Sequence, residues 1–202
     1  MKKILFFALF VTSSFLAGAQ GIGFSIGPKI GYNSNTLTDN LDSIRTSIKN
    51  SLQIGAFMRI GSRFYFQPEA NYQVVSGTLN KSNGSTVQSQ DYTLKSVKIP
   101  AILGFKLINK GIVNLRVLAG PAFTFILDKN LDPSDMGGLW PLQSKDDLKN
   151  SVWSAQMGAG MDVLFMTLDV RYELGIENLY NGSNDLSLKN NMFNVSLGIK
   201  FL

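Results

Sequence analysis

Cysteine and histidine are both absent from the 202 residues of the chain. The lack of cysteine excludes a disulfide scaffold, a thiolate metal site, a cysteine nucleophile and a lipidated N-terminal cysteine. The lack of histidine removes the commonest protein ligand for metals and the usual general base of enzymes. We therefore expect no catalytic residues, no metal and no cofactor.

Charged residues and long hydrophobic runs are also scarce. Only 16% of the residues are charged and 45% are hydrophobic, a balance that argues against intrinsic disorder. Beyond residue 19 no segment has eighteen consecutive apolar residues, which excludes a membrane-spanning helix. The net charge is +5, but the sequence contains no run of lysine or arginine, so we expect no nucleic-acid partner.

The N-terminus has the pattern of a secretory signal peptide. Lys2 and Lys3 precede a mostly apolar run over 4–16, and small residues at 17–19 form an A-x-A cleavage site. The apolar run is shorter than the roughly 20 residues that a membrane-spanning helix needs. We predict a signal peptide at 1–19, cleavage between Ala19 and Gln20, and one exported domain over 20–202.

The mature chain is dominated by segments in which apolar and polar residues alternate. In 63–74 the apolar residues, such as Phe64, Phe66 and Tyr72, fall on one face, while Gln67 and Glu69 fall on the other. A period of two over a dozen residues predicts a long strand with two different faces. Seven further segments repeat this pattern: 22–32, 52–60, 94–108, 112–127, 152–163, 166–177 and 192–202.

The connections between these eight segments alternate between short and long. Short turns are expected at 61–62, 109–111 and 164–165, whereas long polar loops are expected at 33–51, 76–93, 128–151 and 178–191. An even number of long strands with short turns at one end is typical of outer-membrane barrels. We predict an all-β fold, an eight-stranded antiparallel up-and-down transmembrane barrel in the bacterial outer membrane with both termini in the periplasm.

Aromatic residues indicate which face of the strands meets lipid. They gather near both ends of the apolar face, as do the aromatic belts of membrane barrels. A soluble lipocalin-like barrel would instead turn its apolar face inward. The expected belts are Phe24, Phe64, Phe105, Phe165 and Phe201 at the short-turn end, and Tyr32, Tyr72, Phe125, Trp153 and Phe193 at the long-loop end.

Several short motifs resemble those of the PorT-like outer-membrane β-barrel family. They are PEANY at 68–72, VKIPAIL at 97–103, AGP at 119–121, LDVRYE at 168–173 and FNVSLGIKF at 193–201. The resemblance implies an exported eight-stranded barrel without shared catalytic residues. It also implies recognition of a C-terminal aromatic by the barrel assembly machinery, although here Phe201 is followed by Leu202. The family's named member assists a secretion apparatus.

The polar face carries charges of both signs, which would point into the lumen. An eight-stranded barrel has an interior just wide enough for side chains, and buried charges persist only when paired. We therefore predict an ionic network that closes the lumen. Its expected members are Lys29, Arg59, Glu69, Lys98, Arg116, Asp162, Asp169, Arg171, Glu173 and Lys200.

Glycines on the same face would leave space for the long charged side chains. Symmetric pairing about the short turns places Gly55 opposite Glu69, Gly104 opposite Arg116, Gly160 opposite Asp169 and Gly158 opposite Arg171. Prolines at 28, 68, 100 and 121 lie within the expected strands, where each removes a backbone donor. We expect β-bulges or early strand ends at these prolines.

Two loop segments have unusual patterns. Leu37, Leu41, Ile44 and Ile48 recur at helical spacing, which predicts a short amphipathic helix in the first long loop. Leu139 and Trp140 belong to an apolar segment of the third long loop, and such a segment is a candidate contact for a partner.

The function expected from these features is non-enzymatic. The leading hypothesis is an integral outer-membrane protein that contacts lipid, depends on the barrel assembly machinery, and meets an envelope protein through its four loops. One alternative is porin-like passage of ions or small solutes through the lumen. A further alternative is a PorT-like helper of a secretion complex.

Overall fold

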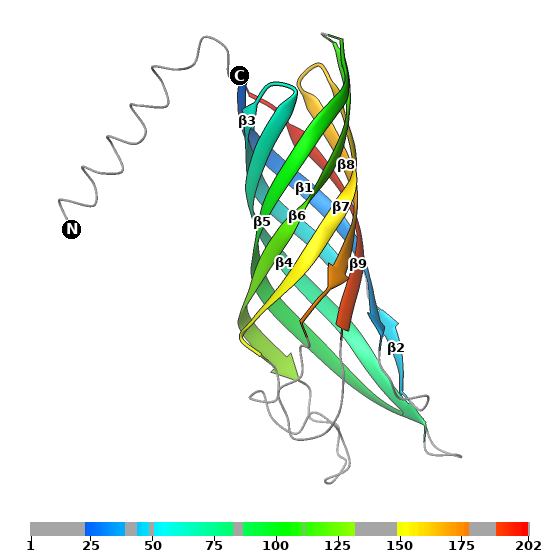
Figure 1. The fold of residues 1–202 in the computed structure, drawn as a ribbon. Coiled ribbons are helices and arrows are strands. Elements are labelled where there is room, and N and C mark those ends of the chain that lie inside the picture. Colours follow the sequence, from blue (N-terminus) through cyan, green and yellow to red (C-terminus); the bar gives the residue numbers. More distant parts are fainter. Residues whose placement is uncertain are drawn as a thin grey trace, which may run out of the picture.

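The computed structural model describes residues 23–38, 44–48, 51–82, 87–110, 112–131, 149–177 and 189–201. All regular structure within these ranges is β-strand (Figure 1). The strands are β1 (Phe24–Thr38), β2 (Ile44–Ile48), β3 (Ser51–Gly61), β4 (Phe64–Ser82), β5 (Val87–Lys110), β6 (Val113–Leu131), β7 (Ser151–Val163), β8 (Met166–Gly175) and β9 (Lys189–Ile199). No helix in these ranges reaches the length and hydrophobicity needed to cross a bilayer.

Eight of these strands close into an antiparallel barrel, as the alternating pattern predicts. Each of them pairs with its sequence neighbour in the wall, and β1 pairs with both β3 and β9, which closes the sheet between the first and last strands. Going around the wall, the order is β4, β3, β1, β9, β8, β7, β6 and β5, with β5 pairing back to β4. Closure leaves no free edge along the body of the barrel.

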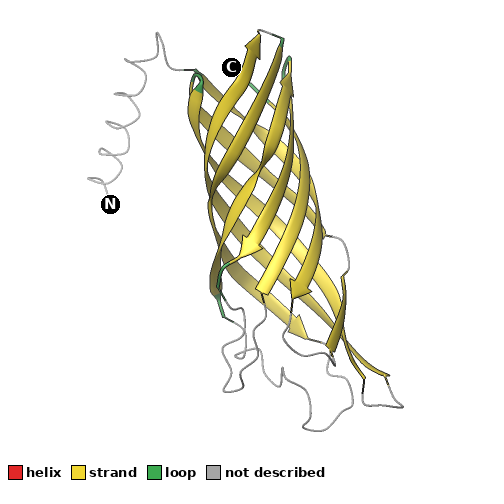
Figure 2. Cartoon of the chain, turned by 45° about the vertical axis from the view of Figure 1, so that its right-hand side comes forward, coloured by secondary structure: helices red, strands yellow, loops and turns green. Residues whose placement is uncertain are grey.

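The two ends of the barrel differ in the length of their connections. Only two residues separate β3 from β4, β5 from β6, and β7 from β8, and these turns lie at the end where the described chain ends (Figures 1 and 2). In the last of these turns Leu164 has a φ of 54°, and the carbonyl of the other turn residue, Phe165, accepts a backbone hydrogen bond from Lys200. The strand ends that the longer connections join lie at the opposite end, where the barrel strands β4, β5 and β6 extend furthest (Figure 1).

The first two long loops differ from the expectation. Residues 76–93 contain a hairpin extension in which the β4–β5 pairing continues from Ser76↔Thr93 to Ser82↔Val87. The polar composition of 76–93 predicted a loop. Strands that extend beyond the bilayer need no apolar face, however, so a polar segment can still be a strand. The helix predicted around Ile44 and Ile48 is wrong: this segment is β2, which pairs with 77–81 of β4. Backbone pairing with the extended β4 outweighs a weak helical periodicity.

The prolines interrupt pairing without shifting it, so the bulges expected there are wrong. Beside each proline two residue pairs are missing from one ladder, and the register is the same on both sides of the gap. Next to Pro28, for example, β9 ends at Ile199 and pairing resumes in the single bridge between Ile26 and Phe201. The register shifts of the β5–β6 ladder lie instead at 95–96 and 106–108.

Side chains alternate between the outer face and the lumen along the barrel strands, wherever the structure describes their burial. In β8, Asp169, Arg171 and Glu173 are buried, whereas Val170 and Tyr172 between them are exposed. All ten residues of the expected aromatic belts lie on the outer face. Nine of them are exposed, and Phe105 is half-buried because its ring lies 4.6 Å from that of Phe64.

Candidate functional site: the charged lumen

A continuous series of ion pairs runs through the middle of the lumen. The Nζ atom of Lys29 lies 2.9 Å from Glu69 Oε2, and Arg171 Nη2 lies 2.6 Å from Glu69 Oε1. The same guanidinium lies 2.7 Å from Asp169 Oδ2. All four side chains are at most 4% exposed. Two cations and two carboxylates thus alternate in space with very little contact with solvent.

The series continues toward the short-turn end. Arg116 Nη2 lies 2.6 Å from Asp169 and 3.1 Å from Asp162, while Arg59 Nη1 lies 2.8 Å from Asp162. Lys200 is the outermost member, since its Nζ is 3.9 Å from Asp162 and its side chain is 20% exposed. Asp162 therefore faces three cations, and the positive charge exceeds the negative at this mouth.

A separate ion pair lies toward the long-loop end. Lys98 Nζ is 2.7 Å from Glu173 Oε2, and that carboxylate also accepts hydrogen bonds from Ser154 Oγ and Gln156 Nε2. Beyond it, outside the membrane-spanning part, Lys149 is paired with Glu177 at 2.7 Å. This ammonium group holds the pKa of the Glu177 carboxyl below its usual range.

Two of the ion pairs join opposite walls of the barrel. Glu69 is on β4 and Arg171 on β8, four places apart in a ring of eight strands. Arg59 on β3 and Asp162 on β7 are also four places apart. Side chains that start from opposite walls therefore meet at 2.6–2.8 Å across the lumen.

Gly160 provides the space in which Arg116 meets Asp169. It is the direct neighbour of Arg116 on β6 and of Asp169 on β8, so the three residues form one row across three strands. A Cβ atom added at Gly160 would lie 2.3 Å from Asp169 Oδ1 and 2.7 Å from Arg116 Cζ. The absence of a side chain is thus required for this ion pair.

Aromatic rings also occupy the lumen near the short-turn end. Tyr65 lies directly opposite Gly104, and an added Cβ there would lie 2.0 Å from its ring. The Tyr65 hydroxyl accepts a hydrogen bond from Arg116, and the Arg59 guanidinium stacks 5.0 Å from the Tyr65 ring centroid and 5.5 Å from that of Phe57. The rings therefore fill space around the cations.

Neutral polar side chains complete the interior. Gln67 donates to Glu69 and accepts a hydrogen bond from Arg59, so it bridges two ion pairs. Thr167 accepts a hydrogen bond from Arg116 and donates to Asp162. The network expected from the sequence contained only charged residues, although Tyr65, Gln67 and Thr167 also lie at the alternate positions assigned to the lumen.

All ten expected network residues described above face the lumen, and each has an oppositely charged partner within 4 Å. Two expected neighbour pairs are wrong, because Gly55 lies opposite Asn71 and Gly104 lies opposite Leu118 on β6. The pairs Gly160↔Asp169 and Gly158↔Arg171 lie as predicted.

Other expected sites fall outside the described residues. These are the signal cleavage site at Ala19 and Gln20 and the loop segment with Leu139 and Trp140. Within the part of the chain that the structure describes, no group of three or more metal-ligating side chains comes together.

Two small hollows border the ion pairs in the part of the lumen that the structure describes. One of about 10 Å³ is bordered by Glu69, Arg171 and Lys98, and another of about 60 Å³ lies on the long-loop side and includes Lys98, Glu173 and Gln73. The smaller is near the limit for a single water molecule. The arrangement can hold cations and carboxylates in direct contact inside the lumen.

A solved structure of an outer-membrane protein shares this fold. OprG from Pseudomonas aeruginosa is 11% identical, with a TM-score of 0.53 over 90% of this chain and 96% of that one. Neisserial surface protein A is 14% identical, with a TM-score of 0.45 over 90% of this chain and 100% of that one. No curated protein matches the sequence. Residues 17–181 match the family model described as "Outer membrane protein beta-barrel domain", and the chain therefore belongs to this family of bacterial outer-membrane barrels.

Proposed function

We propose that the protein is a non-enzymatic outer-membrane barrel whose lumen is closed by its own ion pairs, and that it serves as an anchor for interactions at its loop end. The observation that carries this proposal is the pair of contacts between opposite walls, Glu69–Arg171 and Arg59–Asp162. A solute crossing the lumen would have to separate them.

The energetics support a closed lumen. Breaking a buried ion pair by removing one partner costs about 3–5 kcal/mol, because a charge is left without compensation. Each carboxylate of the central series contacts at least two cations, so opening a path disturbs several pairs together. Thermal fluctuation would then open the lumen only rarely.

Planar-bilayer recording tests the closure. We expect purified wild-type protein to show no steady conductance. The double variant Glu69→Ala/Asp162→Ala removes the carboxylates of both cross-lumen pairs, and it should conduct, provided that its anomalous gel mobility shows a folded barrel. Steady conductance from the wild type would contradict the closure and favour the porin-like alternative.

The interaction role is supported by the wall at the loop end. The β4–β5 hairpin extends beyond the shorter strands, and β2 pairs with its outer part. This gives the loop end a projecting sheet in addition to its loops. Because its motifs resemble those of PorT-like barrels, we propose that the partner is a component of a secretion complex.

Chemical crosslinking in intact cells tests that role. A variant that lacks 77–92 loses the projecting hairpin but keeps the pairing of β4 with β5 from Phe64↔Phe105 to Val75↔Leu94. We expect the wild type to crosslink to an envelope protein and the variant to lose that product at equal abundance. Retention of the product would contradict an interaction through the hairpin.

Export and orientation belong to the same proposal. Residues 1–19 would be removed, so the intact mass of the purified protein should correspond to a chain that begins at Gln20. The short turns and both termini would lie in the periplasm, with the loops at the cell surface.

A further inference from the structure

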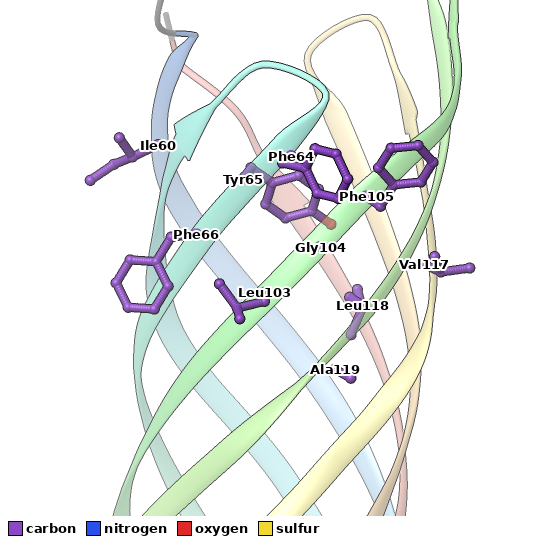
Figure 3. A pocket seen from close by; sticks show the side chains of 10 residues that line it. All are labelled: Ile60, Phe64, Tyr65, Phe66, Leu103, Gly104, Phe105, Val117, Leu118 and Ala119. Atoms are coloured by element: carbon purple, nitrogen blue, oxygen red, sulfur yellow. The ribbon is translucent and has the colours of Figure 1, made fainter.

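An apolar groove runs over the outer face of the barrel near the short-turn end. It has a volume of about 590 Å³ and lies over β3, β4, β5 and β6 (Figure 3). Its outward-facing lining consists of Ile60, Phe64, Phe66, Leu103, Phe105, Val117 and Ala119, and the inward-facing Tyr65, Gly104 and Leu118 also border it. A hollow of this size lies within the range of ligand pockets, about 300–1,000 Å³.

The hollow results from unequal side chains on neighbouring strands. Leu103 on β5 lies directly opposite Phe66 on β4 and opposite Ala119 on β6. The large side chains of Phe66 and Leu103 therefore lie beside Ala119, whose side chain ends at Cβ. The space over Ala119 is left open. The ladder gap next to Pro121 begins just beyond Ala119.

A cation lies at the turn end of this groove. Arg63 is exposed in the turn between β3 and β4, and its guanidinium lies 5.2 Å from the centroid of the Phe105 ring. The Phe105 ring in turn lies 4.6 Å from the Phe64 ring. Two aromatic rings thus close the end of the groove, and a positive charge lies over one of them, Phe105, at the level of the aromatic belt.

A second groove on the outer face lacks this feature. It has a volume of about 820 Å³ and is lined by residues that include Ile30, Leu52, Ile54 and Leu197, without any charged side chain. The lining of the first groove is likewise uncharged, and the polar groups of the second are the neutral ones of Tyr32, Gln53, Tyr72 and Ser76. The groove beside Arg63 combines hydrophobic contact with a charge at one end, which is the chemistry of a phospholipid with its acyl chain and phosphate.

We propose that the groove at Phe66, Leu103 and Ala119 binds one phospholipid, with an acyl chain in the groove and the phosphate on the Arg63 guanidinium. In the orientation proposed above, this lipid belongs to the periplasmic leaflet. Aromatic belts place their rings at headgroup level, which puts Arg63 at the depth of a phosphate. A guanidinium can donate two parallel hydrogen bonds to phosphate oxygens.

Native mass spectrometry of the purified full barrel in detergent tests the site. With phosphatidylglycerol as the probe, we expect one lipid adduct that saturates before the others. Arg63→Gln should weaken this binding about fivefold, the effect of one cation near a lipid surface. Ala119→Phe should abolish it by filling the groove.

Matched controls separate the site from general lipid contact. Ala159→Phe enlarges another exposed alanine on the outer face, and Lys95→Gln removes a half-exposed cation at the other end; both variants should bind the lipid like the wild type. Diacylglycerol, which lacks the phosphate, should bind the wild type as weakly as phosphatidylglycerol binds Arg63→Gln.

Two results would overturn the proposal. Equal binding of phosphatidylglycerol by the wild type, Arg63→Gln and Ala119→Phe would show that no such site exists. Full competition by inorganic phosphate at equal concentration would show an anion site instead of a lipid site. Neither result bears on the closed lumen, because conductance and gel mobility are measured separately.

Discussion

At the scale of single residues, the lumen depends on where side chains are missing as much as on where charges are present. Arg116 and Asp169 meet over Gly160, and the Tyr65 ring covers Gly104. In a barrel of eight strands, the interior is only wide enough for side chains. The glycines beside Arg116 and Tyr65 are therefore packing requirements.

Replacement of Gly160 by alanine tests this requirement. The added Cβ would lie 2.3 Å from Asp169 Oδ1 and force the ion pair with Arg116 apart. Overpacking of this kind costs about 1–3 kcal/mol, measured as the free energy of unfolding in urea with the barrel in liposomes. Gly31→Ala is the control, because its Cβ would come no closer than 3.1 Å to side-chain atoms of Asn194 and Gln53. An equal loss in both variants would show that space at Gly160 is not special.

Removal of Arg171 tests the energetic importance of the buried pairs. Arg171→Ala leaves Glu69 and Asp169 with one fewer cation in a dry interior, so the free energy of unfolding should fall by about 3–5 kcal/mol. Lys95→Ala breaks the half-exposed pair with Asp128 and should cost less than about 1 kcal/mol. If Arg171→Ala cost no more than Lys95→Ala, the lumen would have to be wet around Arg171.

The positions of the lumen charges could be predicted from the sequence, but not which of them pair. A period of two places Glu69 and Arg171 on the inner face whatever the register is. Their contact across the lumen depends on closure and on strand tilt, which arise from the whole sheet. No local pattern carries that information.

At the scale of the strands, the register between neighbouring strands is the property that the sequence predicted least accurately. The turn after β3 comprises residues 62–63 and not the expected 61–62, and this shift of one residue moves Gly55 from Glu69 to Asn71. Between β5 and β6, the turn lies at 111–112 and not at the expected 109–111. This displacement, reduced by one residue at the irregularity of 106–108, moves Gly104 to Leu118. Only the turn at 164–165 lies where expected, and both β7–β8 pairs are correct. Register depends on turn geometry, where an error of one residue is carried along the ladder.

The outer face of β8 offers a test of depth in the membrane. Val170 is at the middle of the strand and faces outward, so Val170→Arg should destabilise the barrel by about 2–4 kcal/mol. Met166→Arg on the same face starts the strand beside the short turn and should cost about 0–1 kcal/mol. Unfolding in liposomes by urea measures both. Equal costs would mean that β8 does not cross the bilayer with Val170 near its centre.

At the scale of the whole molecule, the barrel is asymmetric along its axis. Short turns close one end, and β4, β5 and β6 project furthest at the other. The ion pairs of the lumen tie opposite walls together, while backbone ladders join each strand to its neighbours. Such a barrel should resist dodecyl sulfate until heated, so unboiled and boiled samples should migrate differently. Identical mobility would be inconsistent with a stably closed barrel.

The asymmetry also predicts which end faces the cell surface. Long loops of outer-membrane barrels are extracellular and short turns are periplasmic. An epitope inserted after Trp140 in the third long loop should therefore be accessible to antibody on intact cells, whereas one appended after Leu202 should be accessible only after the outer membrane is permeabilised. Gel mobility verifies that both tagged proteins form barrels. Labelling of the Leu202 epitope on intact cells, with the Trp140 epitope protected, would reverse the orientation and transfer the lipid proposed at Arg63 to the outer leaflet.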